Sequence, residues 1–260
     1  MAKEDFAVLV LSCDKYGDLW PSFLRQFRRH FPAGDWPVYV GSNLTPCGEP
    51  GTIPILSGPD LDWSASCKKI LRQIPERKLF VILEDLLPAS RVDAAEFRRI
   101  IKFLSDADAR HVKYWPDPVP DEPTEFPGIG SYARGAPYRA TVCGFWDRDC
   151  LMSLLLEGES PWNFEILGSY RTAYMDGFYG LTSPLFERRN MIEKGRWIPE
   201  SVEWAQAEGV ELKLDGRPML AGTRGIISRL QAIYFHAMIR VPWRIRTGLM
   251  NKLRRALISY

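Results

Sequence analysis

The sequence predicts an α/β fold built on a mostly parallel sheet that helices cover on both faces. Two observations carry this prediction. Continuous apolar runs, such as residues 6–11 and 79–83, are typical of strands buried on both sides. Amphipathic stretches of helical period alternate with these runs, which is the order found in parallel sheets. With 260 residues and 46% hydrophobic content, the chain can form one large domain or a domain with an appendage.

The elements of the first half follow from their local patterns, in chain order. Residues 6–11 form the first strand, and Leu19, Phe23, Phe27 and Phe31 recur every four residues on the face of a helix. Strands are expected at 38–40 and 53–56. A helix is expected over 63–74, a strand over 79–83 and a helix around residues 97–104.

The second half begins with an irregular segment. Residues 115–127 contain five prolines and four acidic residues, which excludes a helix or a central strand and predicts a surface loop. A strand is then expected over 138–143. Helices are expected over 149–156, 162–174 and 198–207. We therefore divide the chain into a catalytic domain, residues 1–215, and a C-terminal segment, residues 216–260. Within the domain, residues 1–110 and 111–215 form two halves.

The C-terminal segment has a distinct charge pattern. Residues 216–260 contain nine basic and no acidic residues, whereas the rest of the chain contains 25 basic and 32 acidic residues. The charges alternate with bulky apolar residues, as in helices that bind anionic bilayers. This pattern predicts peripheral association with the inner face of a membrane. The alternatives are a helix packed on the acidic body and a dimer interface. Nucleic-acid binding is disfavoured because the apolar residues are mainly aliphatic.

Other patterns limit the function classes. The five cysteines form no CxxC pair and have no histidine at zinc-site spacing, so free thiols and a cytoplasmic location are expected. The chain has no apolar run of 18 residues and no secretory signal pattern. There is no P-loop. The Gly-x-Gly at 128–130 follows a proline-rich loop rather than a strand, which is the wrong context for a dinucleotide site.

Glu84 and Asp85 are the most informative polar residues. They directly follow the apolar run 79–83, at the edge where open α/β sheets bind ligands. Two adjacent carboxylates are costly unless water, a cation or a donor group neutralises them. The alternative is a pair of acidic residues in a solvated loop.

The chain resembles a bacterial glycosyltransferase family of the GT-A class, associated with surface-polysaccharide (capsule, LPS and exopolysaccharide) gene clusters. The segments that carry the resemblance are Leu9–Trp20, Trp63-Ser64, Leu83-Glu84-Asp85, Tyr138-Arg139, Trp146, Ser160–Glu165 and Glu193–Trp197. It covers roughly residues 6–200 and excludes the basic C-terminal segment. It implies a GT-A-like, Rossmann-like sheet and a donor site for a nucleotide sugar.

The resemblance implies specific donor-binding residues. They are Ser12, Asp14, Lys15, Tyr16, Ser64, Lys68, Glu84, Asp85, Lys194 and Arg196. Local chemistry leaves alternatives for several. Asp14 and Ser64 could each cap a helix, Tyr16 could pack beneath its loop, and Lys68 could lie on a solvated helix face.

Glu84 and Asp85 occupy the position of the Asp-x-Asp motif of that class, which implies that Asp85 binds Mg²⁺ or Mn²⁺. Because Leu86 and Leu87 follow, the third motif position is not acidic. Metal dependence is therefore open, and Lys or Arg side chains are the alternative partners of the diphosphate.

Glu165 is the candidate catalytic base. It follows Ser160-Pro161, an expected helix start, where the helix dipole should lower the pKa of the carboxyl group. The alternative is a capping-box role. Asp147 is a rival base, and Asp85 completes the catalytic set. Arg139, Trp146 and Trp162 are the expected acceptor-binding residues, with a core role as the alternative for Trp162.

These inferences predict a glycosyltransferase that moves a sugar from a nucleotide-sugar donor to a lipid-linked glycan acceptor in surface-polysaccharide synthesis. The alternatives are a non-catalytic nucleotide- or glycan-binding module at the membrane and a nucleotidyltransferase on the same fold.

Overall fold

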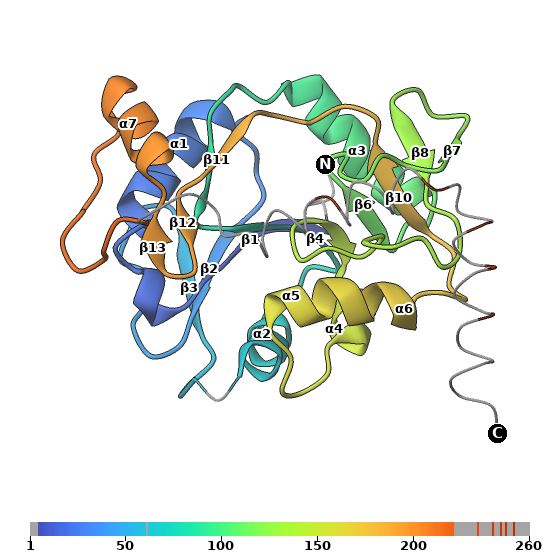
Figure 1. Cartoon of the computed structure of the whole chain (residues 1–260), viewed down its shortest axis with the longest axis horizontal. Helices are drawn as coiled ribbons and strands as arrows, with labels where there is room; N and C mark the ends of the chain where they lie inside the picture. The colour runs from blue at the N-terminus through green and yellow to red at the C-terminus, as the bar shows by residue number, and fades with distance from the viewer. Residues whose placement is uncertain are drawn as a thin grey trace.

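The computed structural model describes residues 5–60 and 62–220, together with residues 233, 241, 245, 248 and 252. Most of the segment 216–260 lies outside the described residues, so its amphipathic helix and membrane contact stay predictions. The described chain forms a mixed α/β fold around one nine-stranded sheet (Figure 1). The strand order is β3-β2-β1-β4-β9-β6-β10-β8-β7. The predicted α/β class is confirmed.

The first four strands form the parallel half of the sheet. They are β1 (Phe6–Leu11), β2 (Val38–Ser42), β3 (Ile53–Leu56) and β4 (Lys78–Leu83). β1 is buried along its whole length, and β4 is buried except at its last residue. These are the continuous apolar runs that the sequence contains, and all four strands were expected.

The other half of the sheet is mixed in direction. Its strands are β6 (His111–Lys113), β7 (Glu122–Pro123), β8 (Ile129–Ser131), β9 (Gly144–Asp147) and β10 (Phe178–Leu181). β9 runs antiparallel to both neighbours, β8 runs antiparallel to β10 and β7, and the seven remaining strands share one direction. β7, inside the proline-rich segment, is one of the two edge strands, and β3 is the other. The sheet thus draws strands from both 1–110 and 111–215.

The prediction of a strand over residues 138–143 is wrong. Those residues form a loop, and the strand is β9. The loop folds back on the sheet, because the Trp146 indole N–H donates to the carbonyls of Thr141 and Val142 at 3.1 and 3.2 Å. Ala140 and Val142 are therefore buried without pairing, which gives the loop the apolar pattern of a strand.

Helices cover both faces of the sheet (Figure 1). Val8 and Val10 of β1 belong to the core that includes α1 (Trp20–His30) and α3 (Ala94–Asp106). Leu9 and Leu11 belong to the opposite core, with α2 (Trp63–Leu71) and α4 (Arg148–Leu154). The period-2 alternation of β1 thus separates two apolar layers.

Helix starts are fixed by capping side chains. The carboxylates of Asp62, Asp93 and Asp147 accept from the third following backbone N–H of α2, α3 and α4, at 2.8, 2.7 and 3.0 Å. Asp62, and not Ser64, is the N-cap of α2. Ser160 caps the next helix, and Pro161 occupies its first turn, as expected.

The expected helix over 162–174 is shorter and contains a π turn. It consists of α5 (Pro161–Asn163), the π-helical turn η2 (Phe164–Gly168) and α6 (Ser169–Arg171). We call residues 161–171 the π-helical segment.

Short elements complete the fold. The 3₁₀ turn η1 (Asp14–Tyr16) follows β1. β5 (Leu86–Pro88) pairs antiparallel with β11 (Arg188–Asn190). β12 (Ile192–Glu193) pairs with β13 (Arg196–Trp197), and α7 (Pro199–Ala207) follows. Within the described part of the chain, no helix has the length and apolarity needed to cross a membrane.

Candidate functional site

The sheet brings two polar loops together at one edge. Leu11 of β1 lies opposite Leu83 of β4, so the loops that begin at Ser12 and Glu84 leave the sheet side by side. The chain leaves β1 through α1 on one face and approaches β4 through α2 on the other. This reversal is the topological switch point at which open α/β sheets bind ligands.

Glu84 and Asp85 lie at this switch point, and each has one buried oxygen without a hydrogen-bond partner among the described residues. Glu84 is 5% exposed, and its Oε2 has no hydrogen-bond partner among the described residues. Asp85 is partly exposed, but its Oδ1 is buried and is likewise without a partner there. Burial raises the pKa of Glu84 well above its usual value, and the neighbouring Asp85 charge raises it further. Burial also raises the pKa of Asp85 to about 6. Among the described residues, these two oxygens gain no hydrogen bond that would offset the cost of their burial.

Arg188 lies close enough to Asp85 and Glu165 for its charge to act on both. It begins β11, which pairs with β5 directly after the acidic pair. Its guanidinium lies 4.7 Å from the ring centre of Trp115 and donates to the Tyr114 hydroxyl at 2.9 Å. Its positive charge opposes the effect of burial on the carboxyl pKa of both Asp85 and Glu165. Arg188 was absent from the expected site.

Glu165 projects from the π-helical segment into the same region. Its Oε1 accepts from the backbone N–H of Val142 at 3.1 Å. Burial raises its pKa, while the Val142 bond and the charges of Lys113 and Arg188 act against this rise. The expectation of a lowered pKa at a helix start is wrong, because Glu165 lies in the π turn after the capped first turn. The capping-box position, three residues after Ser160, belongs to Asn163.

Lys113 is a second cation that the sequence did not single out. It ends β6, is 2% exposed, and donates to the carbonyls of Asp117 and Tyr138 at 2.6 and 3.1 Å. Burial lowers its pKa to about 7, and the nearby charge of Glu165 acts in the opposite direction. Two basic groups, Lys113 and Arg188, therefore lie close enough to Glu165 for their charges to act on its carboxyl group.

The loop after β1 brings a third cation toward the acidic pair. Arg217 donates to both carboxylate oxygens of Asp18 at 2.7 Å, and its guanidinium lies 4.3 Å from the ring centre of Tyr16. Its charge opposes the rise in pKa of Glu84 and Asp85. The Ser12 hydroxyl accepts from the Trp20 indole at 2.8 Å and hydrogen-bonds the Glu84 carboxylate.

Two expected donor-binding residues within this loop, Lys15 and Asp14, have different surroundings. Lys15 is exposed. Asp14 holds the neighbouring loop, since its carboxylate accepts from the backbone N–H groups of Asn43, Leu44 and Thr45 at 3.0–3.1 Å. Burial raises the pKa of Asp14, but these bonds outweigh burial and lower it overall.

Ser64 and Lys68 lie on α2, the helix that precedes β4 in the sequence. Ser64 is fully buried, and its hydroxyl donates to Asp62 at 2.8 Å and to the Leu156 carbonyl. Lys68 is half-buried on the helix. Lys194 and Arg196 are exposed on the β12–β13 hairpin, whose turn residues Lys194 and Gly195 both have positive φ.

Three expected residues lie in the core or at the opposite edge of the sheet. Trp146 is fully buried and stacks on His111 with ring centres 3.9 Å apart. Arg139 is 1% exposed and donates to the carbonyls of Ala133 and Met175. Asp147 caps α4 and binds Lys78 at 3.1 Å, at the amino end of β4. These three side chains are left out of the candidate site, whereas Trp162 is 69% exposed.

The acidic pair fits a divalent cation only in part. The unpartnered Glu84 Oε2 and Asp85 Oδ1 are hard ligands suited to Mg²⁺ or Mn²⁺. No group of three or more His, Cys, Asp or Glu side chains converges for a metal within the described residues. Phosphate oxygens of a donor and water would have to complete the coordination.

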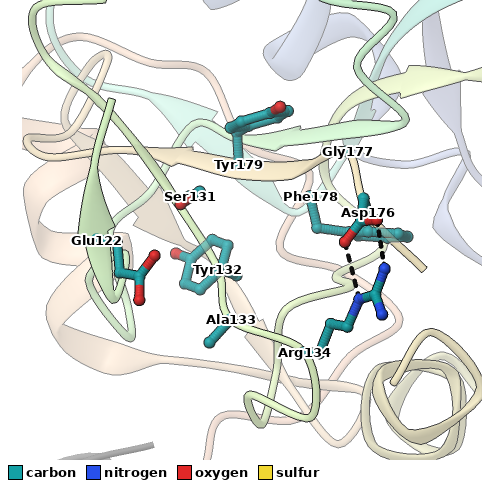
Figure 2. A pocket seen from close by; sticks show the side chains of 9 residues that line it. All are labelled: Glu122, Ser131, Tyr132, Ala133, Arg134, Asp176, Gly177, Phe178 and Tyr179. Carbon is teal, nitrogen blue, oxygen red and sulfur yellow. Dashed lines mark hydrogen bonds and ion pairs between the residues drawn. The ribbon is translucent and has the colours of Figure 1, made fainter. Parts of the chain in front are cut away.

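A separate cavity of about 340 Å³ lies at the end of the sheet formed by β7, β8 and β10 (Figure 2). Figure 2 shows Glu122 and Tyr132 at this cavity, the Arg134–Asp176 ion pair near them, and the Tyr179 ring pointing away from them. Asp176 precedes β10, so the cavity is near the amino end of that strand, and neither Glu84 nor Asp85 lines it.

Comparison with known proteins gives only structural likenesses. No protein-family model matches the chain, and no curated protein matches it in sequence. Among solved structures, S. aureus TarS 1–349 is similar with a TM-score of 0.42 and 10% identity, covering 68% of this chain and 60% of that one. The apo-form glycosyltransferase GlyE of Streptococcus pneumoniae TIGR4 gives 0.40 and 10%, covering 98% and 64%. The WbbM bifunctional glycosyltransferase gives 0.41 and 11%, covering 71% and 40%. Likeness at this level does not establish a shared activity.

Proposed function

We propose that the protein is a glycosyltransferase that uses a nucleotide-sugar donor. The observation that carries this proposal is the acidic pair at the switch point of the sheet. Two of its buried oxygens lack partners among the described residues, and the charges of Arg188 and Arg217, from two other segments, act on Asp85. A ligand with hydroxyl donors and negative phosphates satisfies both sets of groups at once.

The donor would bind across the loops after β1 and β4. Ribose hydroxyls can donate to Asp85 and Glu84, whose oxygens need hydrogen atoms or a cation. The diphosphate suits Arg188, whose planar fork matches phosphate geometry. The loop containing Tyr16 would border the base. When bound, a divalent cation held by Asp85 and Glu84 would supply charge neutralisation to the leaving diphosphate.

Glu165 would act as the general base toward the acceptor. Its carboxylate faces Lys113 and Arg188, and a pKa above the usual value suits proton abstraction near neutral pH. The hydrogen bond from the Val142 N–H fixes Oε1 of Glu165. The other carboxylate oxygen would then accept the proton of the acceptor hydroxyl. The hydroxyl oxygen would then attack the sugar carbon as the diphosphate leaves.

The finer parts of the proposal concern the acceptor and location. We propose a lipid-linked glycan acceptor of surface-polysaccharide synthesis, a cytoplasmic protein and peripheral membrane association through residues 216–260. A homo-oligomer is compatible with these features.

The test uses calorimetry with UDP, GDP and CMP sugars, with and without Mn²⁺, followed by assays of donor hydrolysis and transfer. Asp85→Asn and Glu165→Gln should each lower turnover by at least about 100-fold with the fold intact. Glu203→Gln, which changes an exposed carboxylate on α7, is the matched control and should leave turnover unchanged.

The same screen separates the alternatives. Full activity in both site variants would refute the assignment. Binding without turnover would indicate a non-catalytic module. Turnover of a sugar phosphate with a nucleoside triphosphate would indicate a nucleotidyltransferase.

A further inference from the structure

The π-helical segment carries a face of large apolar side chains that the described fold leaves uncovered. Trp162 is 69% exposed, Ile166 42%, Leu167 45% and Tyr170 57%. Tyr174, just beyond the segment, is 77% exposed. We call these five residues the aromatic face. Grouped exposed apolar side chains of this size mark interaction sites, whereas isolated ones do not.

Residue spacing places three of these side chains on one side of the segment. Trp162, Ile166 and Tyr170 follow one another at intervals of four, close to one helical turn. The opposite side is already packed. Phe164 is fully buried, with its ring centre 5.6 Å from Trp63 and 6.3 Å from Trp146. The segment is thus amphipathic, and the aromatic face is additional to its core-facing side.

The aromatic face contains no available charge. Only two charged residues, Glu165 and Arg171, occur between 160 and 175. Glu165 is turned inward onto the Val142 N–H. Arg171 forms two bonds with Glu159, at 2.7 and 2.8 Å, and its guanidinium lies over the Phe164 ring. An uncharged surface of Trp, Tyr, Ile and Leu matches the headgroup level of a bilayer, where amphipathic rings are favoured.

A basic helix packs against the π-helical segment. Figure 1 shows α2 beside α5 on the same side of the sheet, and the Trp63–Phe164 contact joins the two. Lys68 and Lys69 are half-buried on α2, and Arg72 at its end is exposed. Glu157, in the loop before α5, carries the opposite charge. Three basic residues on the neighbouring helix give this side of the protein charge complementarity to anionic headgroups.

We propose that the aromatic face is a membrane-contact surface, which places its rings at the headgroup level of an anionic bilayer. The proposal does not rest on the proposed glycosyl transfer. It is also separate from the expectation for residues 216–260, because it concerns only described residues of the domain.

The test measures partitioning of the full-length protein onto phosphatidylcholine vesicles with and without phosphatidylglycerol. The triple variant Trp162→Ser, Tyr170→Ser, Tyr174→Ser should lower the partition coefficient on anionic vesicles by at least about 10-fold. Val119→Ser is the control, since Val119 is an apolar residue that is 61% exposed in the proline-rich loop. It should leave partitioning unchanged.

A second readout covers the case in which the triple variant folds poorly. Brominated lipids should quench part of the wild-type tryptophan fluorescence, and Trp162→Phe should lower that bilayer-dependent quenching. Lys69→Gln with Arg72→Gln should lower partitioning on anionic vesicles but not on neutral ones.

Unchanged partitioning in a folded triple variant would overturn the proposal and would leave residues 216–260 as the source of any binding. Loss of a wild-type dimer in light scattering, without a change in vesicle binding, would overturn it in favour of a protein interface.

Discussion

Arg188 donates a hydrogen bond to the Tyr114 hydroxyl at 2.9 Å, and this contact holds its guanidinium at the end of the central strands. Pairing of β11 with β5 places Arg188 opposite Pro88, three residues after Asp85. Trp115 and Tyr114 flank the guanidinium at 4.7 and 5.5 Å from their ring centres. The cation is thus fixed by the apo fold, which favours a preorganised partner for negative charge on a ligand.

Arg188→Gln should lower kcat/KM for the nucleotide-sugar donor by about 100- to 1,000-fold, because it removes a fixed positive charge. Arg188→Lys should recover only part of this loss, since lysine keeps the charge but lacks the planar fork. Initial-rate kinetics over donor concentration provide the measurement. Arg189→Gln is the control, because Arg189 is exposed and its guanidinium lies over Trp204 instead. Equal losses in both variants would contradict a specific role for Arg188.

Asp85→Asn should stabilise the protein near neutral pH while it abolishes activity. Burial raises the pKa of Asp85 from 3.8 to about 6, so the ionised form is less stable in the folded state than in the unfolded state. This destabilisation is absent below pH 3.8, grows as pH rises and is complete above about pH 6. Two pKa units set an upper limit of about 3 kcal/mol on the gain.

Urea unfolding of wild type and Asp85→Asn at pH 4 and pH 7.5 measures this effect. The stability difference should be clear at pH 7.5 and small at pH 4. A variant less stable than wild type at pH 7.5 would show that the Asp85 carboxylate is satisfied in the folded protein, contrary to the unpartnered Oδ1.

Activity should fall on the acidic side of neutrality. The pKa of Asp85 is about 6 and that of Glu165 is raised, in both cases chiefly by burial. Both groups must be ionised in the proposed mechanism, so kcat/KM should rise with pH through about 6 and then level. In Arg188→Gln the rise should move to higher pH, because the charge that opposes both increases in pKa is lost. A flat profile between pH 5 and 8 would argue against both carboxylates.

Local sequence patterns were sufficient for the scaffold of the site. β1 and β4 are continuous apolar runs, and the helices over 20–30, 63–71 and 94–106 have regular stripes. The edge of the sheet that carries Glu84 and Asp85 therefore followed from residue order alone. Their burial did not, because it depends on loops contributed by distant residues.

The cations of the site had no comparable local signal. Arg188 reaches the acidic pair through pairing between strands about 100 residues apart, and Lys113 ends a strand of only three residues. Arg217 was visible only as one charge of the basic segment. Conversely, Trp146 and Arg139 were expected at an acceptor surface, but aromatic packing and backbone carbonyls hold both in the core.

Asp147 provides the last prediction, because its position separates a structural carboxylate from a catalytic one. It lies opposite Lys78 at the start of β4, roughly 20 Å along the strand from Asp85. Burial raises its pKa, but the Cys150 N–H and the charges of Lys78 and Arg77 outweigh burial and lower it overall. Its contribution to stability is therefore present above about pH 4 and is lost as pH falls through the lowered folded pKa. Asp147→Asn leaves the Lys78 ammonium, which is 8% exposed, without its anion and should lower the free energy of unfolding by about 3 kcal/mol at pH 7.

Denaturant unfolding and single-turnover transfer, measured at a temperature where the Asp147→Asn variant is folded, separate the structural role from the catalytic one. The variant should unfold earlier but keep a transfer rate within a few-fold of wild type. A stable variant with abolished transfer would make Asp147 the base and would remove Glu165 from that role.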